Sequence, residues 1–264
     1  MKILVINLDR SPDRLQHMRT VFGEQGLAFE RVPAIDAKTL SEAEIARWRQ
    51  GTPNFYELGS GEVGCFLSHR KCWEMAAANP EPFTVICEDD IFLGRNAAAV
   101  LSDHRWIPAH AGIVKLEASR HKVLLGKDKA AEIDGRSLHL LLRDFTAAGC
   151  YLVSRQCAAR LVAATETFCD PVDQYLFNGN LPHSHGEPVF QLVPAVAIQE
   201  FFLRNPSDMT LGSALRGERR AKRRTGFEKI RREIARPFQK LARNGMALGM
   251  RLFGKRRWMR VPFS

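Results

Sequence analysis

The sequence has no long hydrophobic run, which argues against a membrane-spanning helix. A spanning helix needs about 20 apolar residues, and no apolar run in the 264 residues approaches that length. Residues 3–6 are apolar before polar side chains return at Asn7, which is too short a run for the core of a signal peptide. We therefore expect a cytoplasmic protein.

Motifs for several common chemistries are also missing. The six cysteines include no Cys-x-x-Cys pair, and there is neither a glycine-rich dinucleotide fingerprint nor a Gly-Lys-Ser/Thr phosphate loop. Cys65, His69 and Cys72 share one helical face, which is compatible with a metal site, but no fourth ligand stands at a recognised spacing. Because buried thiols are common in protein cores, we favour a packing role for the cysteines.

Acidic residues are scarce at the C-terminal end. Residues 216–264 hold 17 Lys and Arg and 3 Asp and Glu, a net charge of +14, whereas residues 1–215 hold 22 basic and 26 acidic residues, a net charge of −4. Apolar residues beyond 216 fall on one helical stripe and basic residues fill the other faces. We predict a catalytic domain over residues 1–215 and a basic amphipathic tail over residues 216–264.

Such a tail suits an anionic membrane surface, at about 1 kcal/mol for each basic residue near the lipid. Nucleic acid would attract the same charge, but no aromatic stacking platform or zinc-finger spacing accompanies it. We therefore expect membrane association and no nucleic-acid partner. A solvated basic end is the simpler alternative.

Strand and helix signals alternate through the first hundred residues. Residues 3–6 and 83–87 are short apolar runs typical of strands buried on both faces, and Ser11-Pro12 is a helix-start signal. Later strand signals lie closer together, so we expect an α/β fold with a central mixed, mainly parallel sheet. Further strands are expected at 29–35, 113–116, 137–142, 150–153 and 189–193, and helices at 95–105, 155–167 and 172–178.

Three carboxylates, Glu88, Asp89 and Asp90, directly follow the strand predicted at 83–87. Ligands of open α/β sheets bind beyond the carboxyl ends of the strands. Three adjacent negative charges repel one another, and a divalent cation shared with a substrate diphosphate is the usual way to neutralise them. An acidic surface turn is the simpler alternative.

The turn after the first strand is the second candidate site, at the same edge of the sheet if the two strands run parallel. Arg10 and Arg14 near a helix N-terminus favour an anionic ligand, and Asn7 and Asp9 can bind a base or a ribose. Asp173 is the third candidate, in the first turn of the helix predicted at 172–178. Ordinary helix capping is the simpler alternative for both segments.

In combination these segments resemble glycosyltransferase family 25, the lipopolysaccharide-biosynthesis group of β-galactosyltransferase-like proteins. The resemblance covers roughly residues 1–205, and its motifs occur in the family's order. The matching segments are residues 6–14, 32–37, 61–69, 85–91, 149–154 and 171–173.

The resemblance implies a GT-A-like nucleotide-binding fold and transfer of a hexose with inversion, with UDP-galactose as the expected donor. The implied acceptor is a lipid-linked lipopolysaccharide or lipooligosaccharide glycan. Residues 88–90 stand where such folds keep an Asp-x-Asp motif, so Asp90 and Glu88 would bind Mn²⁺ or Mg²⁺, with Glu88 or Asp89 near the ribose or a metal-bound water. A glutamate replaces the first aspartate of that motif, and this leaves the role of Glu88 open.

The resemblance further implies that Asp173 is the general base for the acceptor hydroxyl, and that Glu62 and His69 shape the donor pocket. A core or capping role explains His69 equally well. Transfer to a lipid-linked glycan would place the protein peripherally on the inner face of the cytoplasmic membrane.

Two other functions are the alternatives. A metal-dependent phosphohydrolase would want a nucleophilic aspartate in an Asp-x-Asp pattern after a strand, whereas the first strand is followed by Asp9-Arg10-Ser11. A non-catalytic nucleic-acid-binding protein would depend on the basic tail.

Overall fold

A computed structural model describes residues 1–143, 146–181, 185–205, 207–211 and 255–264. The strands form a large mixed sheet in the order β13-β7-β9-β11-β5-β10-β3-β1-β2, with β8 beside β9. Its strands are β1 (Lys2–Asn7), β2 (Glu30–Pro33), β3 (Phe83–Glu88), β5 (Ile113–Lys115), β7 (Lys122–Gly126), β8 (Ala131–Ile133), β9 (Arg136–Arg143), β10 (Cys150–Ser154), β11 (Val189–Val193) and β13 (Arg256–Arg260). A small second sheet, in the order β4-β12-β6, contains β4 (Ile91–Leu93), β6 (Glu117–Ala118) and β12 (Ala197–Gln199).

The large sheet is mixed, as predicted, but its antiparallel pairings outnumber the parallel ones. β1 pairs in parallel with β2 and β3, and β5 pairs in parallel with β11. The other described pairings of this sheet are antiparallel. One of them, β8 with β9, is a hairpin closed by a short turn that reverses the chain. The parallel segment β2-β1-β3 is the part that carries the acidic residues.

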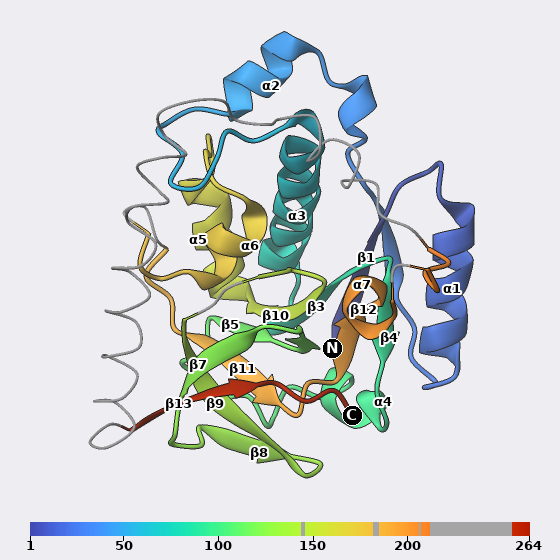
Figure 1. Ribbon diagram of the computed structural model, residues 1–264, viewed down its shortest axis with the longest axis vertical. Coiled ribbons are helices and arrows are strands. Elements are labelled where there is room, and N and C mark those ends of the chain that lie inside the picture. The colour runs from blue at the N-terminus through green and yellow to red at the C-terminus, as the bar shows by residue number, and fades with distance from the viewer. Residues whose placement is uncertain (144–145, 182–184, 206, 212–254) are drawn as a thin grey trace.

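Helices cover both faces of the large sheet (Figure 1). Helix α1 lies on one side, and α3, α5 and α6 lie on the other. The two faces follow from alternation along β1, since Leu4 and Ile6 join one hydrophobic cluster while Ile3 and Val5 join the other. The helical elements are α1 (Pro12–Gly23), η1 (Ala37–Thr39), α2 (Glu42–Trp48), α3 (Ser60–Ala78), α4 (Ala97–Leu101), α5 (Arg155–Ala164), α6 (Val172–Phe177) and α7 (Glu200–Leu203).

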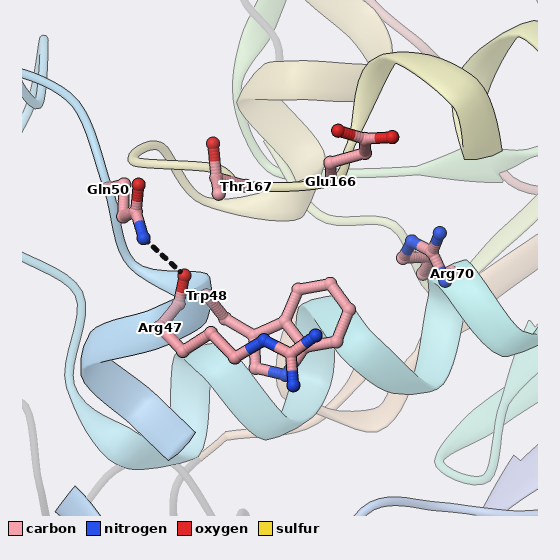
Figure 2. A pocket seen from close by; sticks show the side chains of 6 residues that line it. All are labelled: Arg47, Trp48, Gln50, Arg70, Glu166 and Thr167. Atoms are coloured by element: carbon pink, nitrogen blue, oxygen red, sulfur yellow. Dashed lines mark hydrogen bonds between the residues drawn. The ribbon is translucent and has the colours of Figure 1, made fainter. Parts of the chain in front are cut away.

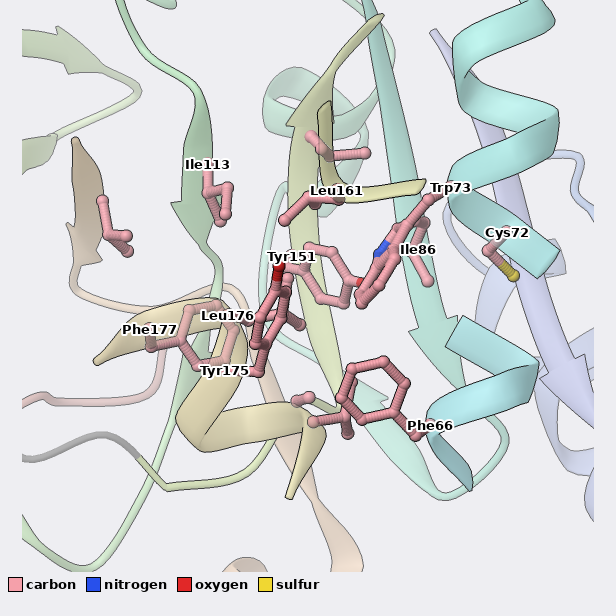
Figure 3. Packing of buried hydrophobic residues seen from close by; sticks show 14 of the residues in the cluster. Phe66, Cys72, Trp73, Ile86, Ile113, Tyr151, Leu161, Tyr175, Leu176 and Phe177 are labelled. Atoms are coloured by element: carbon pink, nitrogen blue, oxygen red, sulfur yellow. The ribbon is translucent and has the colours of Figure 1, made fainter. Parts of the chain in front are cut away.

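Aromatic packing fixes the long helix α3 against the sheet. Phe66 and Trp73 of α3 meet Tyr151 of β10 and Tyr175 of α6 in the cluster shown in Figure 3. The rings of Phe66 and Phe168 stack with their centroids 3.7 Å apart. Burial of each such ring contributes about 1.5–3 kcal/mol, so α3 is a rigid support for the side chains that it carries.

Local signals begin these helices where the sequence indicates. Pro12 occupies the first turn of α1, and Ser41 forms a capping box with Glu44 at the start of α2. At the start of α3 the Glu62 carboxylate accepts a hydrogen bond from the backbone N–H of Gly59. Each bond satisfies a backbone donor that a helix end leaves unpaired.

The end of the chain joins the large sheet. Strand β13 pairs antiparallel with β7, and the Ser264 carbonyl accepts a hydrogen bond from Arg136 at 2.8 Å. The prediction of a basic helical tail over residues 216–264 therefore does not hold for residues 255–264, which add a strand at the edge. Residues 216–254 of that predicted tail lie outside the described residues. Within the described ranges, none of the helices combines the length and hydropathy needed to cross a bilayer.

Candidate functional site

The acidic residues lie at the carboxyl end of β3, beside the end of β1. Ile6 pairs with Glu88 in register, so Asn7 and Asp89 are neighbours. The Asn7 side-chain amide donates to Asp89 Oδ2 at 2.7 Å and to the backbone carbonyl of Ser11 at 3.0 Å. The two segments singled out from the sequence therefore meet at one edge of the sheet, because β1 and β3 are parallel.

Arg14, from the first turns of α1, faces the same carboxylates. Its guanidinium donates to Asp89 Oδ1 at 2.5 Å and lies 3.8 Å from Asp90 Oδ2. Burial raises the pKa of Asp89, against the opposing influence of Arg14 and of the Asn7 hydrogen bond. Arg14 is therefore a partly buried cation, 13% exposed, that lies beside the acidic residues.

Gln199, at the end of β12, joins two of the carboxylates from the opposite side. Its side-chain amide donates to Glu88 Oε2 at 2.7 Å and to Asp90 Oδ1 at 3.0 Å. Burial, and then the charge of Glu88, raise the pKa of Asp90 to about 7. The two carboxylate oxygens thus converge on one position that favours positive charge.

His69 supports Glu88 from α3. The His69 Nε2 atom lies 3.3 Å from Glu88 Oε1, and Nδ1 lies 3.0 Å from the Tyr151 hydroxyl, which also accepts a hydrogen bond from Trp73 at 2.8 Å. Burial alone would raise the pKa of Glu88, but the hydrogen bond and charge of His69, together with Arg14, hold it below its ordinary value. His69 is 1% exposed, so its ring is fixed in place.

The sequence analysis missed a buried ion pair behind the acidic residues. Lys115 of β5 and Glu117 of β6 are joined by a contact of 2.8 Å, and both side chains are almost fully buried. Glu117 Oε1 also accepts the backbone N–H of Gly149, while its Oε2 is buried without a hydrogen-bond partner. Burial raises the pKa of Glu117 to about 7.

Gly149 lies where Gln199 and Glu117 come close to the backbone of β10. A Cβ at this position would lie 2.6 Å from Gln199 Cγ and 2.8 Å from Glu117 Oε2. The Gly149 carbonyl accepts the backbone N–H of Glu88 at 2.9 Å. A glycine followed by an apolar strand was the only available signal in the sequence, and it gave no hint of Glu117 or Gln199.

Asp173 lies in the first turn of α6, as predicted. Its Oδ2 atom accepts the backbone N–H of Ala147 at 3.0 Å, and Lys115 donates to the carbonyls of Thr146 and Ala147. Ala147 stands two residues before Gly149 in the chain. Asp173 is thus tied to the loop that leads into the acidic site.

Three other predicted site residues, Asp9, Arg10 and Glu62, lie further from the acidic residues. Arg10 pairs with Asp36 at 2.6 Å, and Asp9 pairs with Arg31. Arg31 also donates to Asn7 Oδ1 at 3.0 Å, which the sequence did not suggest.

Glu62 is 9% exposed and accepts hydrogen bonds from the Tyr56 hydroxyl and from Gly59, so it fixes the loop before α3. The side chains gathered around the acidic site are therefore Asn7, Arg14, His69, Glu88, Asp89 and Asp90, with Gln199, Lys115 and Glu117 added.

The oxygen atoms of this site suit a hard divalent cation. Glu88 Oε2 and Asp90 Oδ1 already share one electropositive donor, the Gln199 amide. Carboxylate and amide oxygens are the ligands that Mn²⁺ and Mg²⁺ take, and rotation of the Gln199 amide would present its carbonyl to the same position. Both oxygens of Asp89 are engaged by Asn7 and Arg14, so Glu88 and Asp90 are the carboxylates that fit the cation.

A separate cavity of about 410 Å³ lies beside α3, lined by side chains from the end of α2, from α3 and from the loop after α5 (Figure 2). The Trp48 ring is flanked by two guanidinium groups, with Arg47 at 5.8 Å and Arg70 at 5.4 Å from its centroid. The lining is completed by Gln50, Glu166 and Thr167. None of these six residues was among the predicted site residues.

Comparisons with known proteins match this chain to one family. The sequence profile described as glycosyltransferase family 25 (LPS biosynthesis protein) matches residues 1–176. The chain is 30% identical to "Lacto-N-neotetraose biosynthesis glycosyltransferase LgtB" of Neisseria gonorrhoeae, over 83% of this chain and 82% of the relative. It is 28% identical to "Lipooligosaccharide biosynthesis protein lic2B" of Haemophilus influenzae, over 81% and 82%.

Among solved structures, the chain is similar to a glycosyltransferase involved in glycosylation of the major capsid of PBCV-1. The TM-score is 0.42 at 8% sequence identity, over 80% of this chain and 94% of that one. It is also similar to a mutant of LgtC, with a TM-score of 0.33 at 12% identity, over 88% and 99%.

Proposed function

This chain belongs to glycosyltransferase family 25, and from that premise we propose that it is a metal-dependent, inverting galactosyltransferase. The proposed donor is UDP-galactose, and the proposed acceptor is a lipopolysaccharide or lipooligosaccharide glycan. Family membership makes the protein a glycosyltransferase, in place of the phosphohydrolase and nucleic-acid-binding alternatives.

One observation carries the proposal: two carboxylate oxygens and a partly buried arginine lie together at the end of β3. Glu88 and Asp90 both accept hydrogen bonds from the Gln199 side-chain amide, and Arg14 faces the other carboxylate oxygen of Asp90. The diphosphate of a nucleotide sugar and the carboxylates of Glu88 and Asp90 are all negatively charged. A divalent cation bound between them would neutralise both groups. The ends of parallel strands are the usual place for such a ligand.

We assign the nucleotide half of the donor to the edge formed by β1 and α1. Arg14 is placed to bind a diphosphate oxygen, since guanidinium groups recognise phosphate by paired hydrogen bonds. Asp9 presents its carboxylate at the end of β1 for the ribose or the base. Asn7, whose buried side chain donates to Asp89, would position that edge, and Arg31 contacts both residues. Arg10, paired with Asp36, would act as a more exposed positive charge at the same edge.

Departure of the diphosphate builds negative charge on the leaving group. Glu88 and Asp90 would hold Mn²⁺ or Mg²⁺, which supplies Lewis-acid stabilisation of that charge. Arg14 adds hydrogen bonds to the same oxygens. His69 keeps Glu88 ionised and oriented, and Glu62 keeps the loop before α3 in place, so both act as positioning residues in the donor pocket.

Asp173 is our candidate for the general base that takes the proton of the acceptor hydroxyl. A carboxylate in the first turn of a helix is stabilised in its charged form, which is the form that accepts a proton. The bond from Ala147 to Asp173 and the bonds from Lys115 to the same loop support this role, because they hold the carboxylate near the acidic site.

The acceptor and the location follow from the relatives. Their names describe lacto-N-neotetraose and lipooligosaccharide biosynthesis, which supports a lipid-linked glycan as the acceptor. A basic stretch over residues 216–254 supports peripheral binding to the anionic inner face of the cytoplasmic membrane.

A transfer assay tests the proposal. Purified protein is incubated with UDP-galactose, Mn²⁺ and soluble oligosaccharide acceptors, and the product's anomeric configuration is read by nuclear magnetic resonance. We expect a β-linked galactoside, UDP release that stops when the metal is chelated, and no product from Asp90→Asn. An α-linked product would refute inversion, and transfer unaffected by chelation would refute the metal dependence.

A further inference from the structure

Glu88 has two carboxylate oxygens that face different surroundings. Its Oε2 atom faces Gln199 on the side of Asp90, whereas Oε1 faces α3. On the α3 side lie Cys65 and His69, which are four residues apart and therefore on one face of the helix. Cys65 Sγ lies 3.9 Å and His69 Nε2 lies 3.3 Å from Glu88 Oε1, and the three atoms all lie within 4.8 Å of one another.

We propose that Cys65, His69 and Glu88 Oε1 form a binding site for a thiophilic divalent cation such as Zn²⁺, separate from the oxygen site at Asp90. This proposal does not rest on the glycosyltransferase activity. It concerns the Oε1 side of Glu88, where a bound cation would replace the contact between His69 and Glu88.

The separations between the ligand atoms fit tetrahedral zinc. Zinc binds sulfur at about 2.3 Å and nitrogen or oxygen at about 2.0 Å, so tetrahedral angles put two ligand atoms roughly 3.3–3.6 Å apart. The His69–Glu88 separation of 3.3 Å already meets this value, and the Cys65–Glu88 separation of 3.9 Å needs a shift of a few tenths of an ångström. The Cys65–His69 separation lies within 4.8 Å and has to close to about 3.5 Å, a movement that rotation of the Cys65 side chain would have to supply.

The chemistry of the three ligands selects a soft cation. A thiolate and an imidazole favour Zn²⁺ or Co²⁺ over Mg²⁺ and Mn²⁺, which prefer oxygen ligands. Binding converts the Cys65 thiol to a thiolate bonded to the metal, and its proton is released to solvent. The Glu88 side chain is 25% exposed, so water can supply the fourth ligand.

A second layer of contacts orients the histidine for this role. A metal on Nε2 requires that Nδ1 carry the ring proton, and Nδ1 lies 3.0 Å from the Tyr151 hydroxyl. Trp73 donates to the same hydroxyl at 2.8 Å, which fixes its position in the core. Such outer contacts are typical of metal-binding histidines.

The test uses Co²⁺ as a spectroscopic substitute for Zn²⁺ on the full chain, first stripped with a chelator. We expect a sulfur-to-cobalt charge-transfer band, visible d–d bands of tetrahedral intensity, and loss of both when Zn²⁺ is added. Cys65→Ser should lose the charge-transfer band and bind Zn²⁺ at least ~100-fold more weakly, more than the loss expected for an outer contact. His69→Gln should weaken Zn²⁺ binding to a similar degree.

Cys72→Ser is the matched control, because Cys72 lies on the same helix and outside the three-residue set. It should keep the band and the affinity, and circular dichroism confirms that each variant is folded. Excess Mg²⁺ should leave the band unchanged. Absence of the band from the wild type, its survival in Cys65→Ser, its loss in folded Cys72→Ser, or its displacement by Mg²⁺ would each overturn the proposal.

Discussion

Replacing Asp90 by asparagine should make the metal-free protein more stable at pH 8. Asp90 lies beside Glu88 with 14% of its side chain exposed, and partial burial together with the charge of Glu88 raises its pKa from an ordinary value of 3.8 to about 7. Between these two values the folded state binds more protons than the unfolded state. Stability therefore falls as pH rises through this range, and the penalty is fully present above about pH 7.

The size of the effect follows from the pKa change. A pKa raised from 3.8 to about 7 corresponds to a ceiling of about 4 kcal/mol. Part of this free energy is shared with Glu88, because the two carboxyl groups titrate together. Asparagine carries no charge and its carbonyl can still accept the Gln199 hydrogen bond. We expect Asp90→Asn to gain on the order of 1–2 kcal/mol at pH 8, well below that ceiling, and almost nothing at pH 4.

The assay is denaturant unfolding in the presence of a chelator at several pH values, repeated with Mn²⁺. Addition of Mn²⁺ should stabilise the wild type and leave Asp90→Asn nearly unchanged. Asp103→Asn is the matched comparison: Arg105 holds the pKa of this surface aspartate at about 2, so its replacement should give no gain in stability at pH 8. Equal or lower stability of Asp90→Asn at pH 8 would refute the reasoning.

Three further predictions follow from the site and the sheet edge. Gly149→Ala should destabilise the fold by about 1–3 kcal/mol and weaken Mn²⁺ binding, because its Cβ would collide with Gln199 and Glu117. The control is Gly126→Ala, whose Cβ would meet only ordinary contacts and which should keep its Mn²⁺ affinity in calorimetry. Equal Mn²⁺ affinities of the two variants would contradict the account. Asp173→Asn should lower kcat by about 10²–10⁴ while donor binding stays unchanged, whereas Asp13→Asn, at the first turn of α1, should leave kcat near wild type; a fully active Asp173→Asn would remove it as the base. Truncation after residue 254 should lower the free energy of unfolding by at least about 2 kcal/mol, because β13 and buried Val261 are lost. If the truncated chain unfolds at the same denaturant concentration as the wild type, β13 has no structural role.

Proposed membrane binding is tested separately with vesicles. Replacing Lys222, Arg223 and Arg224 with glutamine removes about 3 kcal/mol of attraction to anionic lipid, which is roughly a 100-fold loss of partition. Sedimentation with phosphatidylglycerol vesicles measures this change, with phosphatidylcholine vesicles as the control. Equal sedimentation of both proteins with anionic vesicles would contradict the assignment of the basic stretch.

The parallel half of the fold was predictable because its signals are local. The apolar runs at 3–6 and 83–87 became β1 and β3, and Pro12 began α1 as expected. The expected strands at 113–116, 150–153 and 189–193 also correspond to β5, β10 and β11. Parallel pairing of β1 with β3 then brought Asn7 and Arg14 to the acidic residues, which placed half of the site.

The other half of the site was not predictable from local signals. β4, β6 and β12 are two or three residues long, too short to show a periodicity. Yet this small sheet brings Glu117 and Gln199 to Glu88, although Gln199 lies 111 residues away in the chain. β13 was hidden for a different reason, since its basic residues continue the charge of the preceding stretch.

Calorimetric titration of UDP-galactose, with and without Mn²⁺, tests the central claim most directly. We predict binding to the wild type that requires Mn²⁺ and is lost in folded Asp90→Asn, because Glu88 and Asp90 would hold the cation that meets the diphosphate. Equal binding by the wild type and Asp90→Asn, or binding that does not change when Mn²⁺ is removed, would contradict the claim that the end of β3 is a metal-dependent donor site.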